Sequence, residues 1–299
     1  MLDQHKAMWT GQALGVIKAT QHRIDLNAGA RPVRFAPRRA GHTAREAETA
    51  EVKRQLEADF MEPTSSEWGF PVVLVPKKDG TLRFCVDYGL LNVVSKKDSY
   101  PLPQMDDCID SLGEATIFST LDFNAGYRQV AIAPKDQEKT AFVRHEGAYQ
   151  NKRMPLGLTI APATFQRALD IILSGVKWQS CFIFLDDVIV YSKTEREHVG
   201  HVDRVLRLLR DAEMTLRLPK CRFFRKTVKN LGHEIKPGRL GVVDAHTRVL
   251  PTTRTHVRSF VRMCNVYRRF VPSLARMAAP LTDLMGSAAP VLVPPATPL

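Results

Sequence analysis

Apolar residues recur at the helical spacing in four segments of the chain. These segments are residues 44–60, 161–176, the stretch that follows Thr194, and 255–270. Thr194 and Glu197 have the spacing of a capping box, so they predict where the third helix begins. The predicted buried faces comprise Val52, Leu56 and Phe60; Phe165, Leu169, Ile172 and Val176; Val199, Val202, Val205, Leu206 and Leu209; and Val257, Val261 and Cys264.

Between these helices, short apolar runs bounded by turn residues predict strands. Residues 70–88 form two such runs separated by Asp79-Gly80, which is a strong hairpin signal. Further predicted strands lie at 117–123, 140–143, 148–154 and on both sides of Asp186-Asp187 in the stretch 181–192. Short strands interleaved with helices predict an α+β fold with an antiparallel sheet.

The last of these stretches, "CFIFLDDVIVYS", carries two adjacent carboxylates, Asp186 and Asp187, between apolar runs. They could form the solvated two-residue tip of a hairpin, because Asp tolerates turn conformations. Alternatively, the hairpin lies in a cleft and the carboxylates bind divalent cations, since burying an uncompensated charge costs several kcal/mol. This stretch alone leaves both interpretations open.

Composition narrows the class of protein. The chain is 44% hydrophobic and 25% charged, as is typical of globular proteins, and its apolar runs are too short to span a membrane. It contains five cysteines without a Cys-x-x-Cys spacing, which favours reduced intracellular thiols over disulfides or a zinc site. His198 and His201 are three residues apart on a predicted helix but have no third ligand, so we expect surface or partner contacts there.

The net charge of +12 is concentrated near the C-terminal end. Residues 217–276 hold fifteen Lys and Arg against only Glu234 and Asp244. A solvated helix face normally mixes both signs, so this asymmetry indicates a polyanionic partner, with nucleic acid as the leading candidate.

A third carboxylate, Asp122, ends the predicted strand 117–123 and is followed by Tyr127. Alone, Asp122 is typical of a helix cap, and the basic cluster of Lys77, Lys78 and Arg83 is typical of a solvated turn. Taken together with the acidic hairpin, they fit nucleotidyl transfer. That chemistry needs carboxylates from separate elements to hold two metal ions, and cations to bind a triphosphate.

From about His22 to Met285 the chain resembles the reverse transcriptases of gypsy-class LTR retrotransposons, close to fungal elements. The motifs that carry the resemblance stand in order: "EWGFPVVLVPKKDGTLRFCVDY", "YPLP", "FSTLDFNAGY", "KTAF", "MPLGL", "APATFQ", "FLDDVIVYS", "KC", "LGH" and "VYRRF". The resemblance implies a right-hand polymerase fold with fingers, palm and a short thumb-like element. It also implies an RNA-directed DNA polymerase that adds dNTPs to a primer on an RNA or DNA template.

The resemblance further implies a role for individual residues. Asp122, Asp186, Asp187 and the backbone carbonyl of Phe123 would hold two Mg²⁺ or Mn²⁺ ions. Lys77 and Arg83 would bind the triphosphate, Tyr127 would exclude a 2′-hydroxyl, and Lys220 is a candidate proton donor to pyrophosphate. The remaining predicted contacts are Gln166 and the loop 155–158 with Leu156 at the nucleotide and template, and Phe184, Leu231, Gly232 and His233 at the primer.

The expected organisation is a leader or linker over 1–43, fingers and palm over 44–237, and a thumb-like segment over 238–286. An unstructured tail over 287–299 would precede the position of a ribonuclease H domain. The resemblance implies an intracellular location, in cytoplasmic particles or the nucleus, and leaves the oligomeric state undetermined.

The chain departs from the family pattern at scattered positions. They are Gly89 for Arg, Leu156 for Phe, Ile160 for Asn, Phe184 for Tyr, Arg262 for Gly, and a shortened segment 243–255. These changes keep an alternative open, namely a decayed, catalytically weak remnant that still binds nucleic acid. An RNA-dependent RNA polymerase is a further rival, but Leu185 and Tyr127 argue for deoxynucleotide substrates.

Overall fold

The computed structural model describes most of the chain in two compact units. The described residues are 1–11, 13–76, 82–101, 103, 112, 114–230, 233–237, 239–242, 253–266, 268 and 273–286. Unit 1 comprises Met1–Asn230 with Glu234–Leu240, and unit 2 comprises Leu231–His233 with Gly241–Leu299. The predicted tail 287–299 lies outside the described residues.

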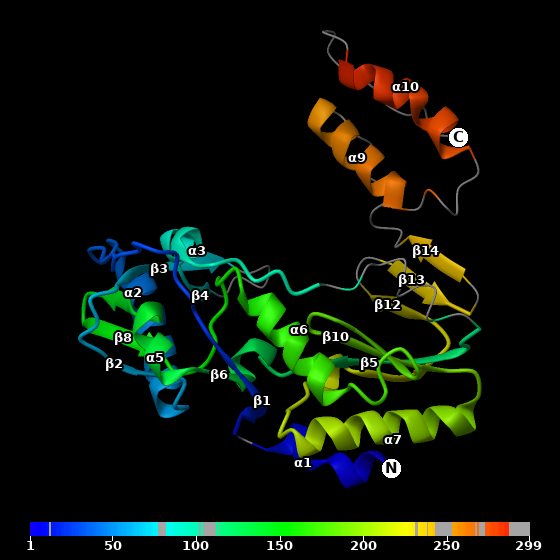
Figure 1. Cartoon of the computed structure of the whole chain (residues 1–299), viewed down its shortest axis with the longest axis horizontal. Coiled ribbons are helices and arrows are strands. Elements are labelled where there is room, and N and C mark those ends of the chain that lie inside the picture. The colour runs from blue at the N-terminus through cyan, green and yellow to red at the C-terminus, as the bar shows by residue number, and fades with distance from the viewer. Residues whose placement is uncertain are drawn as a thin grey trace. The chain divides into compact units, whose positions relative to one another are not determined.

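A four-stranded antiparallel sheet forms one half of unit 1, in the order β11-β5-β10-β9. The strands are β5 (Ile117–Asp122), β9 (Cys181–Phe184), β10 (Asp187–Ser192) and β11 (Arg222–Arg225). Two helices cover this sheet: α6 (Ala161–Ile172) contacts β9, and α7 (Glu195–Asp211) contacts β5 and β10 (Figure 1). Because β10 is covered on both faces, its run of apolar residues is continuous rather than alternating.

A five-stranded mixed sheet forms the other half of unit 1, in the order β2-β8-β7-β3-β4. The strands are β2 (Met61–Pro63), β3 (Phe70–Pro76), β4 (Leu82–Val86), β7 (Phe142–Arg144) and β8 (Gly147–Asn151). The pair β3–β7 is parallel, and the predicted hairpins β3–β4 and β7–β8 are confirmed as antiparallel. The Asp79-Gly80 turn itself lies outside the described residues.

The other described elements connect and cover these sheets. In unit 1 they are η1 (Leu2–His5), α1 (Ala7–Thr10), β1 (Ile17–His22), α2 (His42–Glu57), α3 (Gly89–Val94), η2 (Gly126–Gln129), β6 (Val130–Ile132), α5 (Pro134–Gln137), η3 (Glu138–Thr140), η4 (Leu218–Lys220) and β12 (Val228–Asn230). β12 continues into a three-stranded sheet with β13 (His233–Lys236) and β14 (Arg239–Val242). The helix predicted over 44–60 starts two residues earlier and ends at Glu57, so Phe60 is buried beyond its C-terminus.

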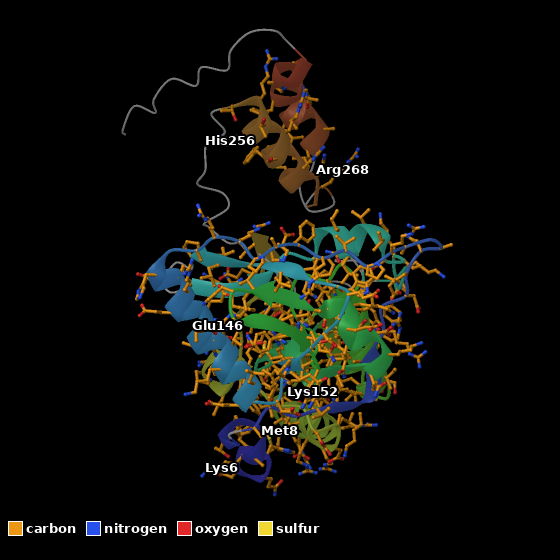
Figure 2. The ribbon with its side chains drawn as sticks, turned by 90° about the vertical axis from the view of Figure 1, so that its left-hand side faces the viewer. Lys6, Met8, Glu146, Lys152, His256 and Arg268 are labelled. Carbon is orange, nitrogen blue, oxygen red and sulfur yellow. The ribbon has the colours of Figure 1, made fainter. Side chains whose placement is uncertain are left out.

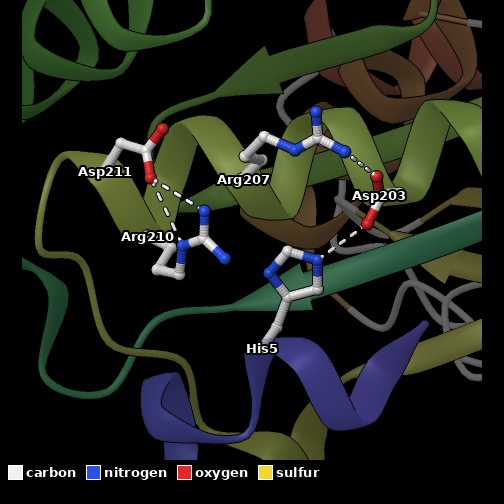
Figure 3. A network of polar contacts seen from close by, with 5 residues as sticks. All are labelled: His5, Asp203, Arg207, Arg210 and Asp211. Atoms are coloured by element: carbon white, nitrogen blue, oxygen red, sulfur yellow. Dashed lines mark hydrogen bonds and ion pairs between the residues drawn. The ribbon is translucent and has the colours of Figure 1, made fainter.

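The N-terminal residues, predicted to be a leader or linker, pack into unit 1. β1 pairs in parallel with β6, and Gly15 lies so close to Glu213 that a Cβ atom would sit 1.6 Å from the Glu213 carbonyl oxygen. Figure 3 shows the buried His5 ring directed at α7, where His5 Nε2 lies 2.9 Å from Asp203 Oδ1; Asp203 also pairs with Arg207. Residues 1–11 and 13–22 are therefore part of the body of unit 1 and not a free linker.

The predicted start of α7 is confirmed, because Thr194 and Glu197 form a reciprocal capping box. Its predicted buried face is wrong at two positions. Val199 is 44% exposed, whereas His198, expected at the surface, is fully buried. Ser119 Oγ lies 2.8 Å from His198 Nε2 and Ser192 Oγ lies 2.9 Å from His198 Nδ1, so both ring nitrogens have partners in the core. His201 also contacts Ser192, at 2.8 Å from its Nδ1.

These buried histidines predict how stability depends on pH. Burial lowers the pKa of His198, and also of the buried His22, to about 4. The unfolded chain takes up these protons near pH 6.5 and the folded chain only near 4. The stabilisation is therefore complete above pH 6.5 and is lost as the pH falls to 4, by about 2–3 kcal/mol for each histidine.

Urea unfolding at pH 7 and pH 4.5 measures this effect. The free energy of unfolding of wild type should fall between pH 7 and pH 4.5. In His198→Asn this fall should be smaller by about 2 kcal/mol. The matched control is His42→Asn, whose side chain is exposed, and it should keep the wild-type difference. If the free energy of unfolding changed equally between the two pH values in His198→Asn and His42→Asn, the proposed titration of His198 would be contradicted.

The described part of unit 2 consists mainly of two helices, α9 (Arg254–Val266) and α10 (Leu274–Gly286), which pack against each other. Val257 is buried on α9, Arg258 and Arg262 are exposed, and Arg269 lies outside the described residues. Val261 and Cys264, which were also predicted to face inward, are only half-buried, so the predicted inward face is fully confirmed at Val257 alone. In the described parts of both units, none of the helices combines the length and the apolar character needed to cross a membrane.

Candidate active site

The acidic hairpin differs by one residue from the hairpin tip suggested by the sequence. Asp187 pairs with Phe184 across β9 and β10, so the two-residue turn consists of Leu185 and Asp186, and Asp187 is the first residue of β10. Leu185 has a φ of +54°, which is uncommon for a bulky residue and indicates a turn under strain. Asp186 is exposed at this turn and Asp187 is half-buried.

Gln166 on α6 holds this strained turn in place. Its side chain is fully buried, and its Oε1 accepts a hydrogen bond of 2.6 Å from the backbone N–H of Leu185. Its Nε2 donates to Asp170 Oδ1 at 3.0 Å and to the Ile183 carbonyl at 3.4 Å. The contacts of Gln166 are thus internal and position the hairpin, while its predicted contact with nucleotide or template stays a prediction.

The third carboxylate faces the hairpin across the sheet. Asp122 is the direct partner of Asp187 on the neighbouring antiparallel strands β5 and β10. Side chains of directly opposed residues leave the same face of a sheet, with Cβ atoms about 5 Å apart. Burial, followed by the negative charges of Asp186 and Asp122, raises the pKa of Asp187 to about 6. The three carboxylates therefore share one negative electrostatic environment.

The donor atoms of this arrangement, three carboxylates, are those that bind hard divalent cations. Mg²⁺ and Mn²⁺ prefer carboxylate oxygens, and the raised pKa of Asp187 shows that its negative charge lacks full compensation. Among the described residues, no three His, Cys, Asp or Glu side chains already lie close enough to hold an ion together. The carboxylates of Asp122, Asp186 and Asp187 would have to turn toward one another from backbone positions that are already adjacent.

An aromatic cluster supports the turn that follows Asp122. The buried Phe123 and the half-buried Tyr127 both pack edge-on against Phe165 of α6, with ring centroids 5.6 and 5.2 Å away. Gly126 permits this approach, because a Cβ atom there would lie 2.9 Å from Phe165 Cζ. Burial raises the pKa of Tyr127 to about 12, and the charge of Asp186 contributes. Tyr127 therefore lies within electrostatic range of Asp186.

The segment around η4 contacts both the side chain and the backbone of Asp122. Lys220 Nζ lies 3.6 Å from Asp122 Oδ2, and the Arg217 backbone N–H donates to the Asp122 carbonyl at 2.8 Å. The backbone N–H of Asp122 donates to the buried Cys221 sulfur at 3.4 Å. Sequence reasoning did not assign Cys221 or Phe165 to the site. The "KC" motif was the available signal for Cys221, and the "APATFQ" motif together with the buried helix face was the available signal for Phe165.

The other predicted site residues are less closely tied to this region. Arg83 is exposed on β4, Leu156 is 52% exposed in its loop, and Phe184 is half-buried at the end of β9. No described contact joins Arg83 or Leu156 to the three carboxylates. Lys77, Leu231 and Gly232 lie outside the described residues, and His233 is the first residue of β13.

Solved structures with a similar fold include those of a foamy viral protease-reverse transcriptase. The foamy viral protease-reverse transcriptase in complex with RNA/DNA hybrid matches with a TM-score of 0.80 and 22% identity, over 96% of this chain and 40% of that chain. The same viral protein in complex with double-stranded DNA matches with a TM-score of 0.83 and 23% identity, over 97% of this chain and 52% of that chain. These similarities confirm the predicted α+β fold of the right-hand polymerases.

Sequence relatives are polyproteins of retrotransposons. The Drosophila melanogaster polyproteins from transposons 297 and gypsy are 34% and 35% identical over 79% of this chain, and a Schizosaccharomyces pombe transposon polyprotein, Tf2-7, is 33% identical over the same share. The chain spans less than a quarter of their lengths: 23%, 24% and 18%. Residues 75–235 match the family described as "Reverse transcriptase (RNA-dependent DNA polymerase)". The chain belongs to the reverse transcriptase family, as the order of its sequence motifs predicts.

Proposed function

We propose that this chain is an RNA-directed DNA polymerase that extends a primer with dNTPs by two-metal nucleotidyl transfer. The observation that carries the proposal is the pairing of Asp122 with Asp187 across β5 and β10, with Asp186 at the adjacent turn. Two carboxylates on neighbouring strands and a third on a fixed turn supply the ligands that this chemistry requires.

Two divalent ions bound there would activate the primer hydroxyl and stabilise the charge on the leaving pyrophosphate. The chain's own residues would orient the substrates around them. Tyr127, braced by Phe165, would lie under the sugar, and Lys77 and Arg83 would bind the triphosphate. Lys220, whose side chain is 55% exposed beside Asp122, would donate a proton to the pyrophosphate.

The partners proposed for the chain are a primer–template of RNA or DNA, and dNTPs. Support for the nucleic acid comes from the complexes of the foamy viral protein with RNA/DNA hybrid and double-stranded DNA. The basic segment 217–276 supports the same partner by its charge. We assign fingers and palm to 44–237 and a thumb-like role to 238–286 as part of this proposal. An intracellular location, in cytoplasmic particles or the nucleus, is proposed on the kinship with retrotransposon polyproteins.

The alternative of a decayed nucleic-acid-binding remnant is not favoured. All three carboxylates are present, the strained hairpin is held by Gln166, and Lys220 lies beside Asp122. The departure at Gly89 is on α3, where the Gly89 N–H donates to Asp87 Oδ1 at 3.2 Å. No described contact joins Gly89 to Asp122, Asp186 or Asp187.

Primer extension on an RNA template with dNTPs and Mg²⁺ tests the proposal. We expect extension on RNA and DNA templates, loss of extension when the divalent cation is chelated, and preference for dNTPs over rNTPs. The control is primer–template binding measured on the same preparation. Binding without extension, in either Mg²⁺ or Mn²⁺, would support the remnant and contradict the proposed activity.

A further inference from the structure

A polar network on α6 adjoins the acidic hairpin. Its centre is Asp170, which lies one helical turn after Gln166 and has a side chain that is only 13% exposed. The network also contains Tyr100, from the "YPLP" motif, and Lys177, which follows α6. None of the residues Asp170, Tyr100 and Lys177 has a role in the proposed function.

The carboxylate of Asp170 accepts from three donors. The hydroxyl of Tyr100 donates to Oδ2 at 2.7 Å, and Lys177 Nζ lies 2.7 Å from Oδ1. Gln166 Nε2 donates to the same Oδ1 at 3.0 Å. Burial, followed by the hydrogen bond to Asp170, raises the pKa of Tyr100 to about 12, so the hydroxyl keeps its proton at neutral pH. A hydroxyl and an ammonium therefore hold the carboxylate in a fixed position, from which it accepts the Gln166 amide.

Tyr100 is attached to α6 by a second set of contacts. Arg167 Cζ lies 4.7 Å from the centre of the Tyr100 ring, which is within the range of a cation–π interaction. Asp98 Oδ1 accepts from the Tyr100 N–H at 3.0 Å and from Arg167 Nη2 at 2.9 Å. The segment 98–100 is therefore joined to α6 through both Arg167 and Asp170.

These contacts determine the orientation of the Gln166 amide. The Leu185 N–H can only donate, so the amide oxygen must face it and Nε2 must find acceptors elsewhere. The acceptors are Asp170 Oδ1 at 3.0 Å and the Ile183 carbonyl at 3.4 Å, and the second of these hydrogen bonds is long. Without Asp170 the amide keeps only the long contact and is free to turn over. Nε2 would then face the Leu185 N–H, one donor against another.

The turn of the hairpin depends on this amide. Leu185 has a φ of +54°, and a bulky residue keeps such a strained conformation only when its surroundings fix it. We propose that Asp170 is a positioning residue for the acidic hairpin, because it fixes the Gln166 amide that holds the turn at Leu185. The turn sets the positions of Asp186 and Asp187, so the consequence for metal binding and catalysis rests on the proposed polymerase function.

Amide hydrogen exchange at Leu185 tests the proposal without a catalytic assay. Asp170→Ala is expected to speed this exchange by about 10-fold, the upper end of what one intramolecular hydrogen bond contributes. Asp170→Asn keeps an acceptor oxygen at the same place and should stay close to wild type. The matched control is Asp211→Ala, which removes an exposed aspartate at the end of α7 and should exchange as wild type does.

Two milder variants decide the question if Asp170→Ala does not fold. Lys177→Met and Tyr100→Phe each remove one of the two groups that hold Asp170. Each should speed exchange at the turn by about 2- to 3-fold, the lower end of what one hydrogen bond contributes. Their control is Lys152→Met, because Lys152 forms an ion pair with Asp59 elsewhere in unit 1 (Figure 2).

Three results would overturn the proposal. One is exchange at Leu185 at the control rate in Asp170→Ala or, if that variant does not fold, in both milder variants. Another is faster exchange throughout unit 1, which would show that Asp170 only stabilises the fold. The last is an equal increase in Asp170→Asn and Asp170→Ala, which would show that the charge of Asp170, and not its hydrogen bond to Gln166, is what matters.

Metal binding measures the consequence for the three carboxylates. Asp170→Ala is expected to bind Mn²⁺ about 10-fold more weakly in a titration followed by electron paramagnetic resonance, a usual cost of losing a group that orients a metal ligand. Half-maximal primer extension should likewise need more Mg²⁺, at unchanged affinity for primer–template. Faster exchange at Leu185 with wild-type Mn²⁺ binding would overturn the positioning role, because the turn would then not place the carboxylates.

The two proposals fail in different experiments. If wild type neither binds Mn²⁺ nor extends a primer, the proposed function is contradicted, and exchange at Leu185 still decides whether Asp170 holds the turn. If wild type extends a primer and Asp170→Ala exchanges at the control rate, only the role of Asp170 is contradicted.

Discussion

Asp187→Asn is expected to abolish primer extension, by at least about 10³-fold, and at the same time to stabilise the metal-free protein. The loss of activity follows from the loss of a ligand charge, since metal ions contribute several kcal/mol to stabilising the transition state. The gain in stability follows from the environment of Asp187. Its carboxylate is half-buried at the start of β10, directly opposite Asp122 and next to Asp186.

The sign of the stability effect comes from the raised pKa. Burial, then Asp186 and Asp122, raise the pKa of Asp187 to about 6, above the 3.8 of an unperturbed Asp. The folded protein therefore holds a proton that the unfolded chain releases, and this contribution to stability is lost as the pH rises through 6. At pH 7 the charged Asp187 destabilises the fold by about 1–2 kcal/mol, allowing for solvent screening of its exposed part. Asn removes that charge with little change of volume.

Urea unfolding and extension assays on the same variant separate the two effects. Without divalent cations, Asp187→Asn should unfold at a higher urea concentration than wild type. With Mg²⁺, wild type should gain stability by binding the ion, and the variant should gain less. Asp211→Asn, an exposed carboxylate at the end of α7, is the matched control and should alter neither property.

Asp122→Asn and Asp186→Asn should also abolish extension while leaving primer–template binding close to wild type. Extension at the wild-type rate by any of the three variants would reject the two-metal assignment. Loss of activity together with a lower stability of Asp187→Asn would instead indicate that the carboxylate has a structural role.

Strands that bury apolar residues were predictable from the sequence, because a run of apolar side chains has few stable positions other than the protein core. The runs before and after Leu185 pair as β9 and β10, and Asp122 ends β5 as predicted. The position of the turn between β9 and β10 was not predictable at single-residue accuracy. Pattern alone favours Asp over Leu at a turn, but the buried amide of Gln166 anchors the Leu185 N–H and thereby fixes the turn one residue earlier.

Long-range polar partners explain the other differences. His198 is polar, so the sequence predicts that its side chain is exposed. Ser119 and Ser192, from two separate strands, instead provide hydrogen-bond partners that offset the cost of burying the ring. The N-terminal segment likewise has no strong periodicity, and its placement depends on Asp203 and Glu213 far along the chain. Ser192 is only six positions from His198, but Ser119 is 79 positions from it and His5 is 198 positions from Asp203. No local pattern encodes contacts at such separations.

Tyr127→Ala is expected to raise the incorporation of rNTPs relative to dNTPs by about 100-fold. Tyr127 follows the strand that ends at Asp122, and its ring is held edge-on by Phe165 at 5.2 Å, so it cannot move away readily from a sugar bound above it. Discrimination by a clash with one group is worth about 1–3 kcal/mol, and truncating the ring removes that clash. Single-nucleotide incorporation with matched dNTP and rNTP concentrations measures the ratio.

Tyr127→Phe is the decisive control, because it keeps the ring and removes only the hydroxyl. If the ring excludes the 2′-hydroxyl sterically, Tyr127→Phe should keep the wild-type ratio while Tyr127→Ala loses it. A large change in both variants would show that the hydroxyl makes the discriminating contact, through a hydrogen bond rather than a clash. An unchanged ratio in Tyr127→Ala would remove Tyr127 from substrate selection altogether and limit it to packing against Phe165. Because burial and the charge of Asp186 raise the Tyr127 pKa to about 12, the hydroxyl stays protonated across the assay range, and the comparison is independent of pH.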